Sequence, residues 1–266
     1  MDINTLKEFV LEFQKNDPAN KVPEELAKSP EYAGREIYSG VTCGAADARD
    51  EIFAALRQNE EANIELTQPD EWLPGAKSVV SFFMPFAKWI TDDNAGGDWP
   101  TAAWLHGRIE GQAASDKLAA ALADMIIEEG YGAVAPSLDQ RFKVIKEKCS
   151  SNWSERHVAF ICGIGTFGIS RGIITELGTA GRLISLVTTL PLEPTPRPYT
   201  DLLEYCIRCG TCAKSCPMNA ISVERLKDNK LCDAFIDKVR AKETPYYGCG
   251  KCQSGMPCAF GIPGRD

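Results

Sequence analysis

The apolar residues of the first 190 positions follow periods that predict alternating helices and strands. Residues 3–13 carry apolar side chains at helical spacing, which predicts an amphipathic helix near the N-terminus. A second helix is expected to begin after Asp50, a typical N-cap residue. A long third helix is expected over residues 101–129, where Gly130 supplies a C-terminal stop. The run 78–84 is short, apolar and β-prone, which predicts a buried strand.

Two further strand predictions come from the second half of this region. Residues 132–136 predict another short strand. Residues 172–176 and 182–190 are β-prone and flank Gly178, so they predict a β-hairpin with a glycine in its turn.

Four prolines then fall within eight residues, at Pro191, Pro194, Pro196 and Pro198. That spacing suits an extended connector rather than a packed helix or strand. We therefore expect two domains, an α/β domain over residues 1–198 and a smaller domain over residues 199–266. The expected fold class is α+β.

Charge and hydropathy narrow the expected partners. The chain has 29 Lys and Arg against 37 Asp and Glu, a net charge of −8. Because a nucleic-acid binder usually carries a basic patch, nucleic acid is not an expected partner. No run of 18 apolar residues is present, and the start lacks the basic and apolar regions of a signal peptide. We therefore expect a cytoplasmic protein without a membrane span.

The chain contains eleven cysteines, of which Cys43, Cys149 and Cys162 are scattered. In a reducing cytoplasm, clustered cysteines point to metal binding or redox chemistry rather than to disulfides. Cys206, Cys209, Cys212 and Cys216, followed by Pro217, have the spacing C-x2-C-x2-C-x3-C-P. This is the bacterial ferredoxin motif, in which three cysteines hold one cluster and the fourth reaches the other.

The remaining cysteines supply a second and less regular group. Sixteen residues separate Cys232 from Cys249, and five separate Cys252 from Cys258. We predict two [4Fe-4S] clusters with crossed ligands. The first would be held by Cys206, Cys209, Cys212 and Cys258, and the second by Cys216, Cys232, Cys249 and Cys252. Cys249-x2-Cys252 alone would also fit a zinc site, but the first motif favours iron.

Three other segments carry a family resemblance. They are Leu73-Pro-Gly-Ala-Lys-Ser-Val-Val-Ser, Glu155-Arg-His-Val-Ala-Phe-Ile-Cys-Gly-Ile-Gly-Thr-Phe-Gly and Tyr247-Gly-Cys-Gly-Lys-Cys-Gln. With the cysteine motifs, they resemble the epoxyqueuosine reductase family and, more distantly, the cobalamin-dependent reductive dehalogenases. The resemblance implies a nitroreductase-like α/β domain followed by a ferredoxin-like domain, with a corrinoid between them that receives electrons from the clusters.

The sequence departs from this family in two places. The carboxylate that acts there as a proton donor is replaced by Cys149. The family's C-terminal helical repeat region, which is used with tRNA, is missing. We therefore expect a paralogue with a different substrate.

Cys149 is our candidate catalytic residue, as a proton donor, a nucleophile or a cofactor ligand. The alternative is a small buried hydrophobic residue. Lys146 and Lys148 would lower the pKa of its thiol if their side chains pointed toward it.

Gly163, Gly165 and Gly168 superficially match the dinucleotide-binding pattern G-x-G-x-x-G. That interpretation requires a helix to follow, whereas a strand is predicted there. As in the resembled family, the glycines would instead form a tight loop against a cofactor. Ser170 and Arg171 would then meet its polar groups, and Trp153 would border its ring system.

Two functions remain open at this point. The first is an iron–sulfur oxidoreductase that passes electrons through two [4Fe-4S] clusters to a cofactor and a substrate, with cobalamin or another corrinoid favoured over a flavin. Its donor would be a ferredoxin or flavodoxin, and its other partner a small molecule or a corrinoid. The alternative is a non-catalytic electron-transfer protein that reduces a partner protein.

Overall fold

The structure is a computed structural model that describes residues 1–59 and 64–265. Its helices are α1 (Ile3–Asn16), α2 (Glu51–Gln58), α3 (Pro69–Trp72), α4 (Lys88–Asp93), α5 (Ala102–Glu128), α6 (Glu155–Ile161), α7 (Thr211–Lys214) and α8 (Asn229–Glu243). Its strands are β1 (Thr42–Asp47), β2 (Ser78–Pro85), β3 (Ala133–Val134), β4 (Val144–Ile145), β5 (Ser150–Ser151), β6 (Gly165–Phe167), β7 (Ile173–Thr175), β8 (Gly181–Thr188), β9 (Ile221–Ser222) and β10 (Leu226–Lys227). Mixed helices and a central sheet are what the pattern of apolar residues predicted.

The central sheet has the strand order β1-β2-β8-β3, and every neighbouring pair is antiparallel. β2 is buried along its whole length. β3 pairs only with Val187 and Thr188 of β8. Among the described residues, no strand covers the same side of residues 181–186, so this stretch of β8 has an open edge.

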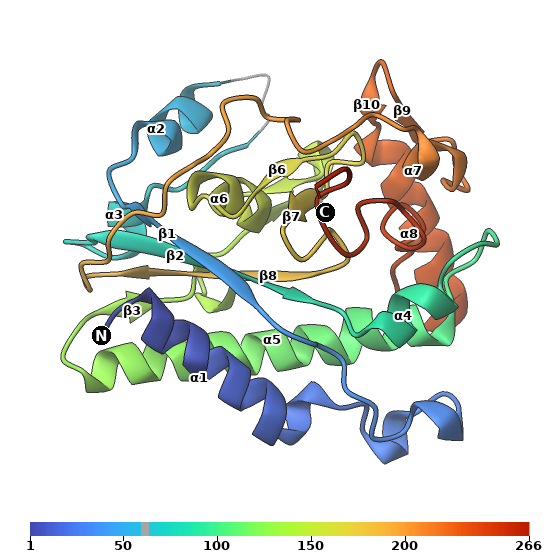
Figure 1. The fold of residues 1–266 in the computed structure, drawn as a ribbon, viewed down its shortest axis with the longest axis horizontal. Helices are drawn as coiled ribbons and strands as arrows, with labels where there is room; N and C mark the ends of the chain where they lie inside the picture. The colour runs from blue at the N-terminus through green and yellow to red at the C-terminus, as the bar shows by residue number, and fades with distance from the viewer. Residues whose placement is uncertain (60–63, 266) are drawn as a thin grey trace.

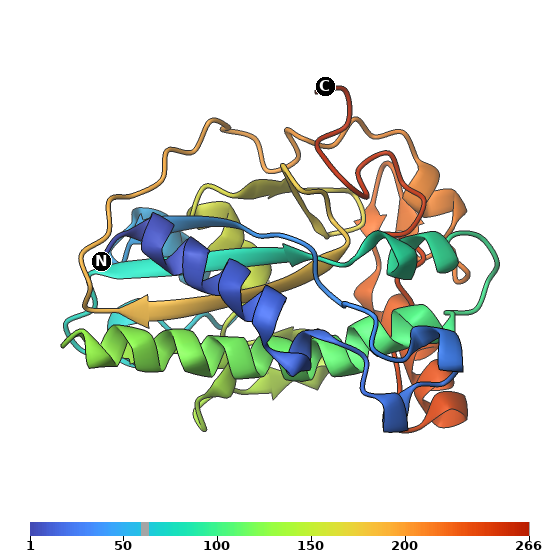
Figure 2. The same cartoon turned by 60° about the horizontal axis from the view of Figure 1, so that its bottom comes forward.

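Helices cover both faces of the sheet. α1 and α5 lie against one face, and α6 with the β6–β7 hairpin lies on the other (Figures 1 and 2). On the first face, Leu6 of α1 and Leu118 of α5 belong to one buried cluster. On the second face, Val158 of α6 packs in another cluster together with Phe83 of β2. The cysteine-rich segment and α8 lie at the end of the sheet where α5 begins.

The predicted helices are confirmed, with bounds within three residues of the pattern. The Asp50 side chain accepts a hydrogen bond from the Ile52 backbone N–H, as an N-cap residue does. α5 ends at Glu128, and Gly130 has φ +87°, the left-handed conformation that stops a helix.

The predicted hairpin of residues 172–176 with 182–190 is wrong. β7 pairs with β6, whereas β8 lies between β2 and β3 in the central sheet. The Gly178 turn instead docks on the cysteine-rich tail, where the Thr179 backbone N–H donates to the Cys258 carbonyl at 3.0 Å. Sequence periodicity cannot choose between such partners, because both pairings leave the same residues buried.

β1 was not predicted. Its residues, Thr42-Cys-Gly-Ala-Ala-Asp, are small and lack a β-branched alternation. Position 44 has no room for a residue larger than glycine, because an added Cβ there would lie 2.1 Å from the Cys162 carbonyl oxygen. The strand exists because of a close tertiary approach.

The proline-rich connector forms no helix or strand, as predicted, and it crosses one side of the molecule (Figure 2). It is tied to the fold along its path. The Thr195 backbone N–H donates to the Ala45 carbonyl at 2.8 Å, and the Tyr199 hydroxyl donates to the Phe160 carbonyl at 2.7 Å. Within the described ranges, no helix has the length and apolar character that a membrane crossing requires.

Candidate functional site

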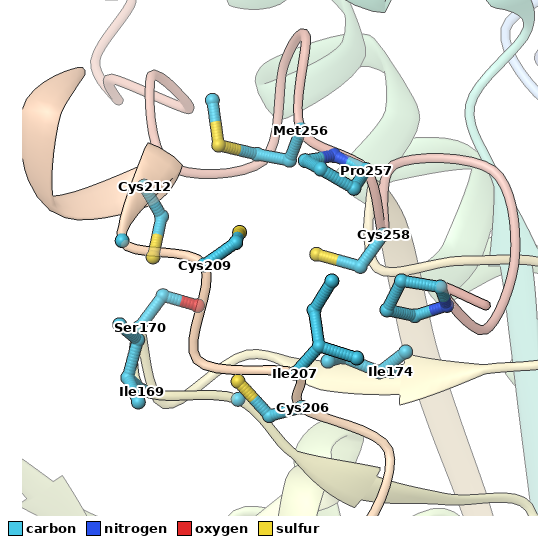
Figure 3. A pocket seen from close by; sticks show the side chains of 13 residues that line it. Ile169, Ser170, Ile174, Cys206, Ile207, Cys209, Cys212, Met256, Pro257 and Cys258 are labelled. Atoms are coloured by element: carbon cyan, nitrogen blue, oxygen red, sulfur yellow. The ribbon is translucent and has the colours of Figure 1, made fainter. Parts of the chain in front are cut away.

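The eight clustered cysteines gather into two groups. Figure 3 shows the first group, Cys206, Cys209, Cys212 and Cys258, around one cavity with their sulfur atoms pointing into it. Cys206, Cys209 and Cys212 come from the first motif, and Cys258 comes from the end of the chain. The fold therefore brings together the four cysteines that were predicted to hold the first cluster.

Local backbone geometry aims the thiols of the first motif. Arg208 has φ +52° and Gly210 has φ +72°, so the chain folds back within the two-residue gaps between cysteines. Gly210 then begins the short helix α7, which carries Cys212. The Cys216 thiol lies outside this cavity and accepts a hydrogen bond from the Ala220 backbone N–H at 3.2 Å.

The second group is recognised by the electrostatic effect of its members on one another. Burial raises the pKa of Cys249 to about 12, and the proximity of Cys252, Cys232 and Cys216 adds to the rise. Burial likewise raises the pKa of Cys252, with Cys232 and Cys216 contributing. The Cys249 and Cys252 thiols therefore ionise reluctantly, and bound iron would stabilise their thiolates.

Both groups thus have the membership that the crossed assignment predicted, although their role as ligands stays a prediction. Cys252 lies between them, because it also raises the pKa of Cys212 and of Cys258. In residues 1–59 and 64–265, no group of three or more His, Cys, Asp or Glu residues is placed to hold a single metal ion.

The loop that carries Cys249 and Cys252 is anchored to the sheet domain. The buried ammonium group of Lys251 donates to the Asn94 carbonyl at 3.0 Å and to the Gly96 carbonyl at 2.7 Å. The Gln253 side-chain amide donates to the Thr179 carbonyl at 2.9 Å. These bonds hold the second cysteine group against the end of the sheet.

The predicted glycines and Ser170 lie in three places. Gly168 and Ser170 line the first cysteine cavity, in the turn between β6 and β7. Gly165 pairs in β6, where an added Cβ would lie 2.3 Å from the Ile174 carbonyl oxygen. Gly163 faces the connector, with an added Cβ 3.0 Å from the Pro196 carbonyl oxygen. The glycine segment therefore allows close backbone packing, and a cofactor role for it remains a prediction.

Trp153 lies inside the protein. It is 1% exposed and stacks on Phe53 with ring centroids 6.2 Å apart. Its indole N–H donates to the Ser185 hydroxyl at 2.9 Å. The structure encloses this side chain, and its role at the border of a cofactor stays a prediction.

Cys149 is half-buried in a left-handed backbone conformation, with φ +48°. Burial raises the pKa of its thiol, and nearby Asp233 adds to the rise. The pKa of this thiol is thus raised rather than lowered, and the Lys148 ammonium group pairs with Glu65 at 2.6 Å. The thiol lies near the beginning of α8, whose Cys232 also influences it.

A further set of charged groups gathers beside the open edge of β8. Arg156 is exposed, yet the surrounding protein lowers the pKa of its guanidinium, and Arg171 adds to the effect. Beside it lie the buried Glu155 carboxyl oxygens and the buried Arg182 Nε atom, which have no hydrogen-bond partners among the described residues. We call this place the central recess, formed by Arg108, Glu155, Arg156, Arg171, Arg182 and Tyr247.

Glu155 is the unusual group of the central recess. Burial raises the pKa of its carboxyl to about 8, and the nearby Ser185 hydroxyl and Arg182 guanidinium only partly oppose this. Neither carboxyl oxygen has a hydrogen-bond partner among the described residues. At neutral pH this side chain therefore holds a proton that it can release.

Sequence reasoning named only Arg171 of the recess as a cofactor residue. Glu155, Arg156 and Tyr247 stand in segments that carried the family resemblance, so a signal was present for these three. Arg108 and Arg182 lie in α5 and β8, where a lone arginine in an amphipathic element has no distinguishing pattern.

Comparison with known proteins supports the cluster motif. The 4Fe-4S binding domain family matches residues 201–222. Epoxyqueuosine reductase from Listeria monocytogenes serovar 1/2a (strain ATCC BAA-679 / EGD-e) is 30% identical over 114 residues, which cover 39% of this chain and 29% of that protein. The chain thus spans less than a third of the length of the curated relatives it matches.

Solved structures share the fold. An epoxyqueuosine reductase with a tRNA-Tyr epoxyqueuosine-modified stem loop has a TM-score of 0.51 at 19% identity, covering 99% of this chain and 68% of that chain. The catabolic reductive dehalogenase NpRdhA has a TM-score of 0.55 at 17% identity, covering 84% of this chain and 30% of that chain. The resemblance to both kinds of reductase is confirmed. The tRNA stem loop belongs to that neighbouring structure, and our expectation about nucleic acid for this chain stays a prediction.

Proposed function

We propose that this chain is an iron–sulfur oxidoreductase of the epoxyqueuosine reductase and reductive dehalogenase type. Electrons would enter at the first cluster, pass to the second and reach a cofactor and substrate in the central recess. One observation carries the proposal. The second cysteine group borders the recess, because the Tyr247 hydroxyl, two residues before Cys249, accepts a hydrogen bond from Arg108 at 2.8 Å. The proposed location is the cytoplasm, where clustered thiols stay reduced.

The proposed cofactor is a corrinoid, with a flavin as the less favoured choice, and a nitroreductase-like character of residues 1–198 belongs to this proposal. Several groups fit the polar rim of such a cofactor. The Arg182 Nε atom and both Glu155 carboxyl oxygens lack hydrogen-bond partners among the described residues. A bound corrinoid would supply a redox-active metal.

The two histidines do not offer a lower ligand for that metal. The His106 ring is fully buried, with Nε2 accepting from the Lys28 backbone N–H and Nδ1 bonded to Glu110. His157 Nδ1 bonds the Ser154 hydroxyl, and burial lowers the pKa of this ring to about 4. A corrinoid would therefore be held here without a histidine ligand.

Two residues are proposed as proton donors in the reaction. Cys149 stands where the resembled family has its proton-donating carboxylate, and it lies near Cys232 of the second group. Glu155 is the second candidate, because it is protonated at neutral pH in the recess itself. A general acid works best when its pKa lies near the working pH, and the pKa of about 8 for Glu155 meets this condition.

The electron donor is proposed to be a ferredoxin or a flavodoxin. Cys209 of the first group is exposed, and the exposed apolar side chain of Ile207 lies beside it. Because electrons tunnel best over short distances, an exposed edge of the first cluster would be the entry point. The alternative function, a non-catalytic electron-transfer protein, uses the same entry but leaves the recess without a cofactor.

The decisive test is the composition of the protein isolated anaerobically from its native host. Two clusters predict about eight irons and eight acid-labile sulfides per chain. A corrinoid or flavin released by extraction and identified by mass supports the oxidoreductase. Clusters alone, with no corrinoid or flavin bound on titration, would support the electron-transfer alternative and reject the proposed cofactor site.

A further inference from the structure

We propose that the central recess binds an oxyanion, a carboxylate or phosphate group of a small molecule, between Arg108 and Arg182. This inference deepens the proposed function and rests on it for the reaction that follows binding. The anion itself has two candidate sources, the substrate and a phosphate of the bound cofactor. Both offer the chemistry that an arginine pair recognises, because the planar guanidinium matches two oxygens of such a group.

The first observation is that the arginines of the recess lack partners of opposite charge. Among the described residues, none of Arg108, Arg156, Arg171 and Arg182 forms an ion pair with a carboxylate. The Arg182 Nε atom is buried and has no hydrogen-bond partner in that part of the chain. A buried donor without a partner costs stability, so a bound acceptor there would be favourable.

The second observation is the orientation of Arg108. Its Nη2 atom donates to the Tyr247 hydroxyl at 2.8 Å, and its guanidinium stacks over the Tyr247 ring at 4.4 Å from the centroid. These contacts hold the plane of the guanidinium and leave other N–H groups for a ligand. An arginine fixed in this way loses little freedom when an anion binds.

The third observation is the repulsion between the two cations. Burial lowers the pKa of Arg108 to about 10, and the nearby charge of Arg182 is the next contribution. Glu155 does not relieve this repulsion at neutral pH, because burial raises its pKa to about 8 and keeps it uncharged. An anion between the two guanidinium groups would remove the repulsion.

Compensation of cluster charge explains only part of the arrangement. Cys252 and Cys232 favour the charged form of Arg156, so this arginine can balance the second cluster. The groups that favour the charged form of Arg108 are the hydroxyls of Tyr247 and Tyr38 instead. Arg108 and Arg182 therefore need another negative partner.

The test is thermal unfolding of the anaerobically purified holoprotein with inorganic phosphate as the probe. Phosphate should raise the midpoint saturably, by about 5 °C near saturation, over chloride at equal ionic strength. The R182Q variant should lose this shift. Without phosphate its unfolding midpoint should equal or exceed that of the wild type, because the variant has no repulsion between positions 108 and 182. R182K keeps the positive charge but lacks the paired N–H donors of the guanidinium, so phosphate should raise its midpoint by a smaller amount.

R57Q is the matched control, because Arg57 is exposed and paired with Glu71 far from the recess. It should keep the full phosphate response. Absence of a shift in the wild type both before and after cofactor extraction, or an equal shift in R182Q and wild type, would overturn the inference.

Protein with and without its extractable cofactor separates the two sources. A shift that persists in the cofactor-loaded protein assigns the oxyanion to the substrate. A shift seen only after cofactor extraction assigns it to a phosphate of the cofactor. Failure of the proposed function would show instead in the iron and cofactor analysis, which the phosphate response does not influence.

Discussion

Gly250 lies against the indole face of Trp104. An added Cβ at position 250 would fall 1.9 Å from the Trp104 Cε2 atom. Gly250 separates Cys249 from the rest of the second cysteine loop, and Trp104 belongs to the first turn of α5. Because this contact leaves no room for a methyl group, glycine sets how closely the loop approaches the helix.

The G250A variant should lose the second cluster. Its methyl group cannot fit against Trp104, and alanine disfavours the φ of +67° that position 250 adopts. Overpacking and the left-handed conformation should together cost about 2–5 kcal/mol. Iron analysis should show a fall from about eight to about four atoms per chain.

G264A is the control for this variant. Gly264 has φ +78°, and an added Cβ there would meet no atom within 4 Å. It should carry the conformational cost and retain all the iron. A full iron content in G250A would show that Trp104 yields and that the loop tolerates a side chain.

The crossed assignment predicts which cysteine variants resemble one another. C216S and C232S should both perturb the second cluster, whereas C206S and C258S should both perturb the first. Electron paramagnetic resonance of the reduced protein should therefore give two matching pairs of spectra. If C216S matched C206S instead, the four cysteines of the first motif would hold a single cluster.

Cys149 lies close to Cys232, so its status as a ligand can be tested directly. We expect C149S to keep about eight irons, because both predicted ligand sets are complete without it. C232S, the matched variant, should lose about four. Loss of iron in C149S would place Cys149 in the second cluster, rather than in proton transfer.

Glu155 should make the stability of the protein depend on pH. Burial raises the pKa of its carboxyl from the ordinary 4.5 to about 8. Between these values the unfolded chain releases the proton while the folded protein keeps it, so folding is progressively disfavoured as pH rises. E155Q cannot ionise, so its unfolding free energy relative to wild type should rise by up to about 1.4 kcal/mol per pH unit.

This difference should be smallest at or below pH 4.5 and level off above pH 8. Parallel urea titrations of both proteins at several pH values measure it. A difference that stays constant with pH would show that Glu155 ionises normally in the folded protein.

The Tyr246 hydroxyl should stabilise the contact between the segment after α8 and α5. It donates to Glu110 at 2.9 Å, and Glu110 bonds His106 at 3.0 Å. Because His106 Nε2 accepts from the Lys28 N–H, its Nδ1 must carry the proton that bonds Glu110. Removing one hydroxyl leaves buried Glu110 short of a partner.

Y246F should therefore lower the free energy of unfolding by about 1–3 kcal/mol. Y131F is the control, since its hydroxyl forms no hydrogen bond within the described ranges. Thermal unfolding compares the two variants. Equal midpoints would mean that water replaces the lost hydroxyl at Glu110.

Local patterns in the sequence predicted much of this protein. The α1 and α5 helices follow from apolar spacing, because a helix repeats its face about every 3.6 residues whatever packs against it. The cysteine motif followed from spacing too, since two-residue gaps direct neighbouring thiols to one cluster. The extended connector was also predicted from the sequence, because proline has no backbone N–H to donate in a helix or strand.

The sequence by itself therefore determined the helices, the buried strand β2 and the two sets of clustered thiols. The tertiary structure alone decided that β7 pairs with β6, that Gly250 rests on Trp104, and that Arg108 and Arg182 lie near one another. The reason is physical. A local pattern records which side of an element is buried, whereas strand partners and charge neighbours depend on contacts between residues far apart in the chain.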